Sequence, residues 1–174
     1  MEKLKAVTLK DEKIIDSWSI LIEDAQGREE EIYQATLKRI EENNPPGVRV
    51  DKVEVRPGWL KGVFGKKREY LMVGNERLRD FKMYVGARDY GNNLDVCWYL
   101  TCEPGFFKKR ISKALTESDK ALSYILDLFD QQDLRAYATV VHHCVLDAVE
   151  ILMTKMGQDT SKIERKSRGF LGIS

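Results

Sequence analysis

Cysteine, proline and glycine are all scarce in this sequence, and it has no long apolar run. Its 174 residues include 3 cysteines, 4 prolines and 12 glycines, which excludes a disulfide scaffold, a collagen-like chain and a Pro/Gly-rich disordered chain. The longest continuous apolar run, Val96 to Leu100, is far shorter than the roughly 18 residues that a membrane span needs. Residues 1–13 alternate charged with single apolar residues and lack the apolar core of a signal peptide. We therefore expect a cytoplasmic protein with reduced cysteines and no transmembrane segment.

Neither sign of charge dominates the composition. The net charge is +1, so the chain as a whole has no bias towards nucleic acid or acidic partners. Hydrophobic residues make up 43% and charged residues 33%, which is the composition of a chain that can bury one core. We expect a single α+β domain over residues 1–158, followed by a basic C-terminal tail with an apolar tip over residues 159–174.

Residues 14–43 allow two interpretations. Their apolar side chains roughly fit one long helical stripe, but Gly27 would then lie inside a helix, at a cost of about 1 kcal/mol relative to alanine. Alternatively, a strand near 17–23 precedes a helix near 27–43, because apolar residues also alternate across the first of these ranges. Glu29 to Glu31 would then place negative charge in the first turn of the helix, where it is favourable. We prefer the second interpretation.

The middle of the chain is rich in strand patterns. Alternating apolar residues predict strands near 48–55, 70–73, 81–88 and 94–102. Asp89 to Asn93, between the last two, contains Gly and Asn, which tolerate the positive φ of hairpin turns. We therefore expect a β-hairpin over residues 81–102.

In the first of these predicted strands, the valines occupy even-numbered and then odd-numbered positions. The valines at 48 and 50 share one parity and those at 53 and 55 share the other. Side chains on a regular strand alternate between its two faces, so we expect an edge bulge or a bend near Asp51 and Lys52.

The last third of the chain has helical periodicity in two apolar stripes. Thr116 and Asp119 resemble an N-terminal cap, and the stripe that follows includes Leu128 and Phe129. A second stripe runs from Leu134 to Met156 and, on one continuous helix, would point almost opposite to the first. We therefore expect two packed helices with a turn near residues 130–133.

The expected order is thus strand, helix, four strands and helices. It predicts a single antiparallel sheet of four to five strands, packed on one face by helices. The order resembles that of TATA-binding-protein-like and helix-grip folds, but the similarity is one of topology and implies no function.

The sequence contains no recognisable catalytic or cofactor motif. Glycines with the spacing of a phosphate-binding loop or of a dinucleotide-binding turn are absent. His142, His143 and Cys144 are consecutive, so on a helix they diverge by about 100° each and cannot converge on one metal ion. We expect His142 and Cys144 to pack in the core and His143 to pair with Asp147 in solvent. We therefore predict no catalytic residue, metal or cofactor, and an enzyme is the less favoured class.

One face of the predicted sheet is unusually rich in tyrosine. The assigned strands place Tyr70, Tyr84 and Tyr99 opposite the apolar face. Cys97 and Cys102 are separated by an odd number of residues, so they lie on opposite faces, Cys102 in the core and Cys97 on the open face. This face could bind a ligand, pair with a second copy, be covered by the N-terminal segment, or only stabilise the sheet through cross-strand packing.

Basic residues are concentrated in three segments. Residues 56–68 carry five basic and no acidic side chains, residues 104–113 carry four and none, and residues 162–168 carry four and one. The first two segments share a pattern in which a Pro-Gly turn and apolar aromatics precede a basic cluster. The candidate binding residues are Trp59, Lys61, Lys66, Lys67, Arg68, Phe106, Phe107, Lys108, Lys109 and Arg110.

Aromatic side chains beside lysines suit an anionic lipid surface or a single-stranded nucleic acid. In the plainer interpretation, the aromatics complete the core under loops while the lysines stay solvated. A protein partner or a homo-oligomer is a further possibility. We predict a non-catalytic binding or assembly module that acts through these basic-aromatic loops. The alternative is an enzyme or small-molecule-binding protein with a pocket near Glu103 and His142.

Overall fold

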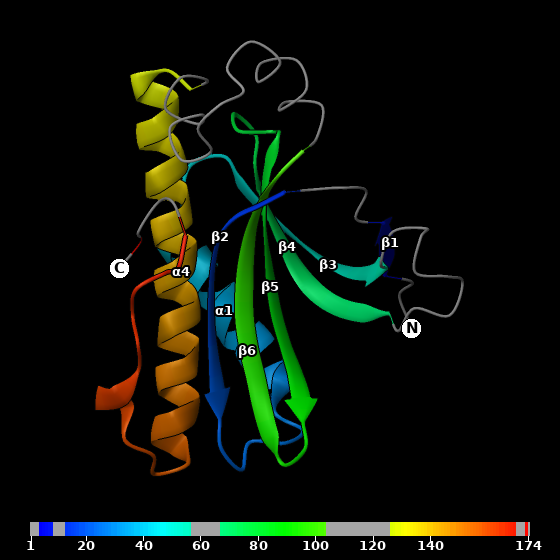
Figure 1. Cartoon of the computed structure of the whole chain (residues 1–174), viewed down its shortest axis with the longest axis vertical. Coiled ribbons are helices and arrows are strands. Elements are labelled where there is room, and N and C mark those ends of the chain that lie inside the picture. Colours follow the sequence, from blue (N-terminus) through cyan, green and yellow to red (C-terminus); the bar gives the residue numbers. More distant parts are fainter. Residues whose placement is uncertain (1–3, 9–12, 57–66, 104–125, 170–172, 174) are drawn as a thin grey trace.

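The computed structural model describes residues 4–8, 13–56, 67–103, 126–169 and 173. Six strands form one mixed sheet in the order β1-β3-β4-β5-β6-β2, and two helices cover one of its faces (Figure 1). The elements are β1 (Lys5–Thr8), β2 (Lys13–Ile22), α1 (Glu29–Asn43), β3 (Val48–Arg56), β4 (Arg68–Asn75), β5 (Phe81–Tyr90), β6 (Asn93–Cys102), α4 (Leu128–Lys155) and a short 3-10 helix (Thr160–Lys162).

The predicted α+β class and the order from β2 to α4 are confirmed. Residues 13–22 form a strand and residues 29–43 a helix, so the second interpretation of this region is right. The predicted hairpin is also present, because Tyr90 pairs with Asn93 across Gly91 and Asn92, and Gly91 has a φ of 64°.

The sheet itself differs from the prediction of four to five antiparallel strands. It has six strands and is mixed, because β1 pairs in parallel with β3. The charged N-terminal segment carries too few apolar residues to predict a strand. Val7 nevertheless packs against a small cluster of Val53, Val55 and Tyr84 on the sheet face away from the helices.

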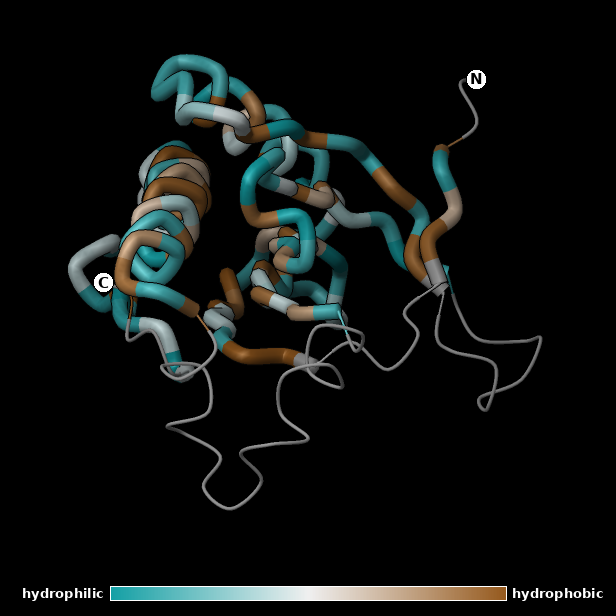
Figure 2. The backbone as a smooth tube through the Cα atoms, turned by 90° about the horizontal axis from the view of Figure 1, so that it is seen from above, coloured by the Kyte–Doolittle hydropathy of each residue, from teal (hydrophilic) through white to brown (hydrophobic). Residues whose placement is uncertain are grey.

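The main core lies between the sheet and the two helices. Alternate residues of β5 and β6 point into it, including Met83 and Trp98, and α4 contributes Val141 and Val145. Figure 2 shows α4 end-on beside the sheet, with hydrophobic and hydrophilic residues interleaved along both. This interleaving is expected of elements that bury only one face.

No bulge interrupts β3, so the bulge that we expected near Asp51 and Lys52 is absent, and the alternative of a bend stays a prediction. Its pairing with β4 runs from Val48 opposite Asn75 to Val55 opposite Arg68 without a shift in register. The parity of the valines changes because Val48 packs against the main core, whereas Val55 joins the cluster on the other face. A strand with apolar contacts on both faces thus produces the pattern that we assigned to a bulge.

The expected turn near residues 130–133 is also wrong. The side chain of Asp127 caps α4 by accepting the Asp130 N–H (2.8 Å), and the helix then continues to Lys155. Leu128 and Phe129 are 75% and 73% exposed. The end of the first apolar stripe therefore lies on the exposed face of α4, whereas the second stripe lies on its buried face. The cap predicted at Thr116 and Asp119 lies outside the described residues.

Within the described part of the chain, α4 is the one helix long and apolar enough to cross a membrane, with a mean hydropathy of 1.3 over 18 residues. These properties are equally typical of a core helix. In this fold α4 packs against α1 and β6, and 61% of that window is buried. Its length and composition are therefore weak evidence for a membrane span.

The described part of the predicted basic tail packs along β2 and α4. Ile163 and Ile173 are buried. The hydrogen bonds that hold this segment include those from Trp18 Nε1 to Glu164 O (2.5 Å), from the Arg168 N–H to Ser17 O (2.9 Å), and between His142 Nε2 and Arg165 O (2.6 Å). It thereby covers part of the outer edge of β2, which would otherwise expose unpaired backbone groups.

Candidate functional site

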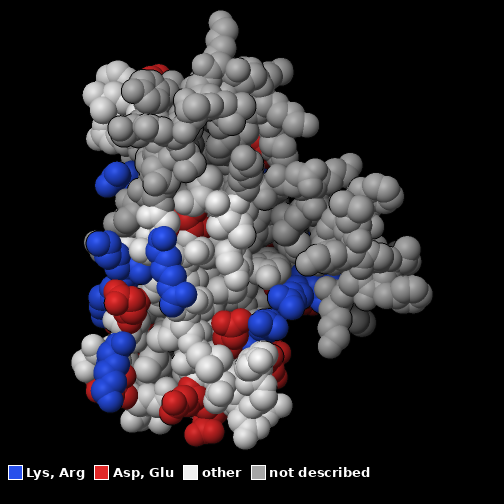
Figure 3. Space-filling view, viewed as in Figure 1, with Lys and Arg blue, Asp and Glu red and all other residues white. Residues whose placement is uncertain are grey.

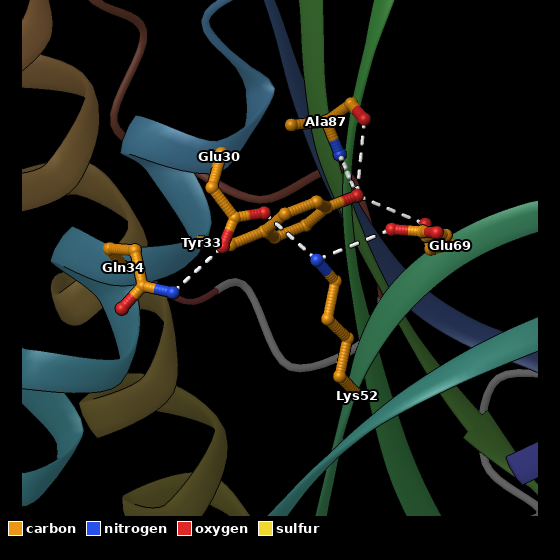
Figure 4. A network of polar contacts seen from close by, with 6 residues as sticks. All are labelled: Glu30, Tyr33, Gln34, Lys52, Glu69 and Ala87. Carbon is orange, nitrogen blue, oxygen red and sulfur yellow. Dashed lines mark hydrogen bonds and ion pairs between the residues drawn. The ribbon is translucent and has the colours of Figure 1, made fainter. Parts of the chain in front are cut away.

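Strands β4 and β5 pair over only part of their length. Their ladder runs from Gly74 opposite Lys82 to Leu71 opposite Val85, and its continuation would pair Glu69 with Ala87. The hydroxyl of Tyr33, from α1, lies at that position instead (Figure 4). It accepts the Ala87 N–H (3.0 Å) and lies within donating distance of Glu69 O (3.0 Å) and Ala87 O (3.1 Å). The hydroxyl replaces one rung of the ladder, and the two strands part beyond it.

Lys52 supports Tyr33 from the neighbouring strand β3. Its Nζ atom lies 5.2 Å from the centroid of the Tyr33 ring and pairs with Glu30 (2.8 Å) and Glu69 (3.3 Å). The hydrogen bond to Glu30 raises the pKa of Lys52 above its ordinary value. Hydrogen bonds from Gln34 and then from Lys52 lower the pKa of Glu30. These contacts tie α1 to β3 and β4 around the tyrosine (Figure 4).

A cavity of about 270 Å³ opens where β4 and β5 part. We call it the split-sheet cleft, and its lining includes Tyr33, Arg68, Tyr70, Gly86, Arg88 and Tyr99. A Cβ atom on Gly86 would lie 2.6 Å from Tyr70 Cε1 and 3.4 Å from Cys97 Sγ. The absence of a side chain at residue 86 therefore lets the Tyr70 ring lie against β5.

The basic residues of the cleft differ in how they are paired. Lys67 Nζ lies 3.2 Å from Glu54, and Arg88 Nε lies 3.1 Å from Asp95. The guanidinium of Arg68 is exposed and interacts with the Tyr70 hydroxyl, and no carboxylate of the described residues forms an ion pair with it. Arg68 is thus the cation of the cleft that is available to a ligand.

The tyrosines and the cysteine of the cleft are neutral groups at physiological pH. Burial raises the pKa of Cys97 to about 11 and also raises the pKa of Tyr70. The neighbouring Cys97, followed by burial, raises the pKa of Tyr99 to about 12. A nucleophilic cysteine has a lowered pKa, so Cys97 is not activated and the tyrosine hydroxyls serve as hydrogen-bonding groups.

On the face drawn in Figure 3, the described side chains form no large patch of one charge. In Figure 3, basic and acidic side chains are intermixed over the part of this face that is not grey. On this face, the described residues would therefore attract an anion through a local group of cations rather than through a broad positive surface.

Two of the candidate binding residues, Lys67 and Arg68, lie in the described part of the chain, at the start of β4. The others lie outside it, namely Trp59, Lys61, Lys66, Phe106, Phe107, Lys108, Lys109 and Arg110. The second basic-aromatic segment follows Glu103, whose N–H donates to Asp80 O (2.9 Å) just before β5. The start of β5 lies beside the end of β4, so the two segments leave the sheet at opposite ends.

The residues of the alternative pocket have other contacts. Lys82 Nζ lies 2.6 Å from the Glu103 carboxylate. Trp98 Nε1 donates to His142 Nδ1 (2.9 Å), which leaves the ring proton on Nε2 for Arg165 O. Burial lowers the pKa of His142. Neither Glu103 nor His142 lines the split-sheet cleft.

The rest of the histidine cluster is arranged as its helical spacing predicts. Cys144 is buried and His143 is exposed, and Asp147 lies 3.3 Å from Arg39 Nε. The pair between His143 and Asp147 stays a prediction. Over the ranges that the structure describes, no group of three or more His, Cys, Asp or Glu side chains could hold a metal ion.

Replacing Tyr33 with phenylalanine is expected to lower the free energy of unfolding by about 1 to 2 kcal/mol. The change removes the hydroxyl that the Ala87 N–H and the Glu69 carbonyl share, and buried polar groups without partners cost about this much. Urea denaturation measures the loss, and faster amide hydrogen exchange at Ala87 should accompany it. Tyr90→Phe is the control, because Tyr90 is 64% exposed. Equal stability of the two variants would contradict the role of the hydroxyl.

Sequence reasoning missed Tyr33 and the cleft. Tyr33 fits the buried stripe of a helix, and nothing local to it indicates that its hydroxyl enters a strand ladder. Gly86 is the sequence signal that could have pointed to the site, because a glycine inside a strand often marks a close approach. Comparison of the chain with family models, with curated proteins and with solved structures finds no match.

Proposed function

We propose that this protein is a non-catalytic binding module that holds an anionic group, a phosphate or a carboxylate, in the split-sheet cleft. The proposal rests on Arg68. Its guanidinium borders the cavity and has no carboxylate partner among the described residues. A guanidinium binds carboxylate and phosphate through two parallel hydrogen bonds. The hydroxyl of Tyr70 adds a neutral donor to the same cavity, whereas that of Tyr99 forms a hydrogen bond with Cys97.

The size of the cavity supports a small ligand. Ligand pockets usually have volumes of roughly 300–1,000 Å³, and the cleft, at about 270 Å³, lies just below this range. A phosphate or carboxylate on a small molecule, or on the headgroup of a lipid, would fit this volume.

The chemistry of the cleft supports binding rather than catalysis. Its cysteine has a raised pKa, and its tyrosines are neutral donors. The alternative of an enzyme or small-molecule site at Glu103 and His142 has less support. The Glu103 carboxylate already pairs with Lys82, and both ring nitrogens of His142 already have partners.

Charge reversal at the cleft tests the proposal. The double variant Lys67→Glu/Arg68→Glu is expected to bind glycerol phosphate at least about tenfold more weakly in calorimetry, a loss of about 1.4 kcal/mol. The matched control is Lys38→Glu/Lys162→Glu, which makes the same change in net charge at exposed positions away from the cleft. Wild-type affinity in the control and similar thermal midpoints in both variants are expected.

A second arm of the test separates the two sources of the anion. The probes are vesicles of phosphatidylcholine with or without phosphatidylserine, with a single-stranded oligonucleotide as competitor. Binding to glycerol phosphate in solution indicates a small molecule, and binding only to the anionic vesicles indicates a lipid headgroup. If neither probe binds the wild type, or if the two double variants bind equally, the proposal is overturned.

A further inference from the structure

Glu29, the first residue of α1, brings an unusual group to the split-sheet cleft. It lines the cavity, and its Oε2 atom is buried without a hydrogen-bond partner among the residues that the structure describes. Two cations close to the start of α1 pair with other carboxylates, Arg28 with Glu31 (3.1 Å) and Lys52, on β3, with Glu30 (2.8 Å). Buried carboxylate oxygens normally have a partner, so this one calls for a donor that is not part of the described chain.

The other acidic side chains of the cleft do not share this property. Each has a partner of its own, Glu69 with Lys52 (3.3 Å), Asp95 with Arg88 (3.1 Å), and Asp89 with the Gly27 N–H (2.8 Å). Among the acidic residues that line the cavity, Glu29 is therefore the one with a buried oxygen that lacks a partner among the described residues.

The cavity thus contains a cation without a carboxylate partner and a buried carboxylate oxygen without a donor, both judged among the described residues. On the β4 side, Arg68 lacks a carboxylate partner among the described residues, and on the α1 side Glu29 has a buried oxygen that lacks a donor. A purely anionic ligand would satisfy Arg68 but would place negative charge near Glu29. An ammonium group would satisfy the carboxylate with up to three N–H donors. A lone carboxylate does not make a metal site, because a bound ion needs several ligands.

From this pairing we infer that the ligand of the split-sheet cleft is a small zwitterion, with an ammonium group that binds Glu29 and a phosphate or carboxylate that binds Arg68. The inference rests on the proposed function and adds to it the class of ligand. Glu29 is the residue that determines specificity, because it distinguishes an amino-bearing anion from a plain anion.

The test compares two probes that share a phosphate monoester and differ in the ammonium group. Phosphoethanolamine carries the ammonium and glycerol phosphate does not. Calorimetry on the full chain is expected to give a Kd at least about tenfold lower for phosphoethanolamine, which corresponds to about 1.4 kcal/mol. Glu29→Gln is expected to abolish this preference while leaving the Kd for glycerol phosphate unchanged or lower.

A control and a stability measurement accompany the variant. Glu41→Gln removes an exposed carboxylate from the other end of α1 and should keep the preference of the wild type. Glu29→Gln removes a carboxylate with an unpartnered buried oxygen but also a charge that is favourable in the first turn of α1. The two effects oppose each other, so its thermal midpoint should stay close to that of the wild type, and a loss of binding then reflects recognition rather than misfolding.

The outcomes separate this inference from the proposed function. Equal affinity of the wild type for the two probes, or a preference that persists in Glu29→Gln, overturns the zwitterion and leaves binding of an anion through Arg68 intact. Failure of the wild type to bind either soluble probe overturns the zwitterion, and the proposed function is overturned with it only if the anionic vesicles also fail to bind.

Discussion

Replacing Asp16 with alanine is expected to lower the free energy of unfolding by about 3 kcal/mol and to release the C-terminal segment. Asp16 is 1% exposed. Its Oδ1 atom accepts the N–H groups of Ser17 (2.7 Å) and Gly169 (2.8 Å), and its Oδ2 atom accepts the Ser167 hydroxyl (3.0 Å). A hydrogen bond to a charged group contributes about 1.5–3 kcal/mol, and partial relaxation around the alanine keeps the total near the stated value.

Urea denaturation measures the loss of stability, and limited proteolysis reports the release of the tail. Asp51→Ala is the matched control, because Asp51 is exposed on β3, and its effect should stay within about 0.5 kcal/mol. Cleavage between residues 157 and 169 should become faster in Asp16→Ala alone. A loss below about 1 kcal/mol with unchanged proteolysis would show that the carboxylate does not anchor the segment.

The stability of the protein is expected to fall as the pH is lowered below about 6.5, the ordinary pKa of histidine. Burial lowers the pKa of His142 in the folded state, so the unfolded chain binds this proton first. The contribution of the neutral ring is therefore complete above the unfolded pKa and is lost as the pH falls from there towards the folded pKa. The slope for one proton is at most about 1.4 kcal/mol per pH unit.

The geometry around His142 explains the direction. Protonation would place an N–H on Nδ1, opposite the indole N–H of Trp98, so the present hydrogen bond would become a contact between two donors. The charged groups around the ring act in both directions, because His143 and the Arg165 side chain lower its pKa, whereas Asp16 raises it. Burial is the largest of these effects.

Unfolding free energies measured at about pH 7.5 and about pH 5.5 test this expectation. The wild type should lose stability between the two values, and His142→Gln should lose less, because glutamine does not titrate. In NMR spectra, the Trp98 indole N–H resonance of the wild type should change over the same interval. A wild type that gains stability on acidification, or a variant with the same loss, would contradict the account.

The elements set by local patterns were the predictable part of the fold. Alternation over 94–102 placed Cys102 in the core, and the Gly91-Asn92 turn closed the hairpin as its residue types predict. Helical spacing was sufficient to bury His142 and expose His143. Each of these features depends on residues within a few positions of one another.

The features that could not be predicted depend on distant contacts. The β1 strand exists because Val7 meets a cluster on β3 and β5, and periodicity within four residues cannot reveal that contact. The cleft depends on a hydroxyl of α1 that enters a ladder between two strands. Lys67 and Arg68 were identified from local charge, but their position beside Tyr70 and Gly86 follows from the register of the sheet.

The most direct test of the central claim is an NMR titration of the wild-type chain with phosphoethanolamine. If the split-sheet cleft is the binding site, the largest changes in backbone amide shift will occur at Arg68, Tyr70, Gly86 and Arg88. Residues on the far side of the molecule, such as Glu150 on α4, should not respond. Changes centred on Glu103 and His142 instead, or no change at any concentration, would contradict the account.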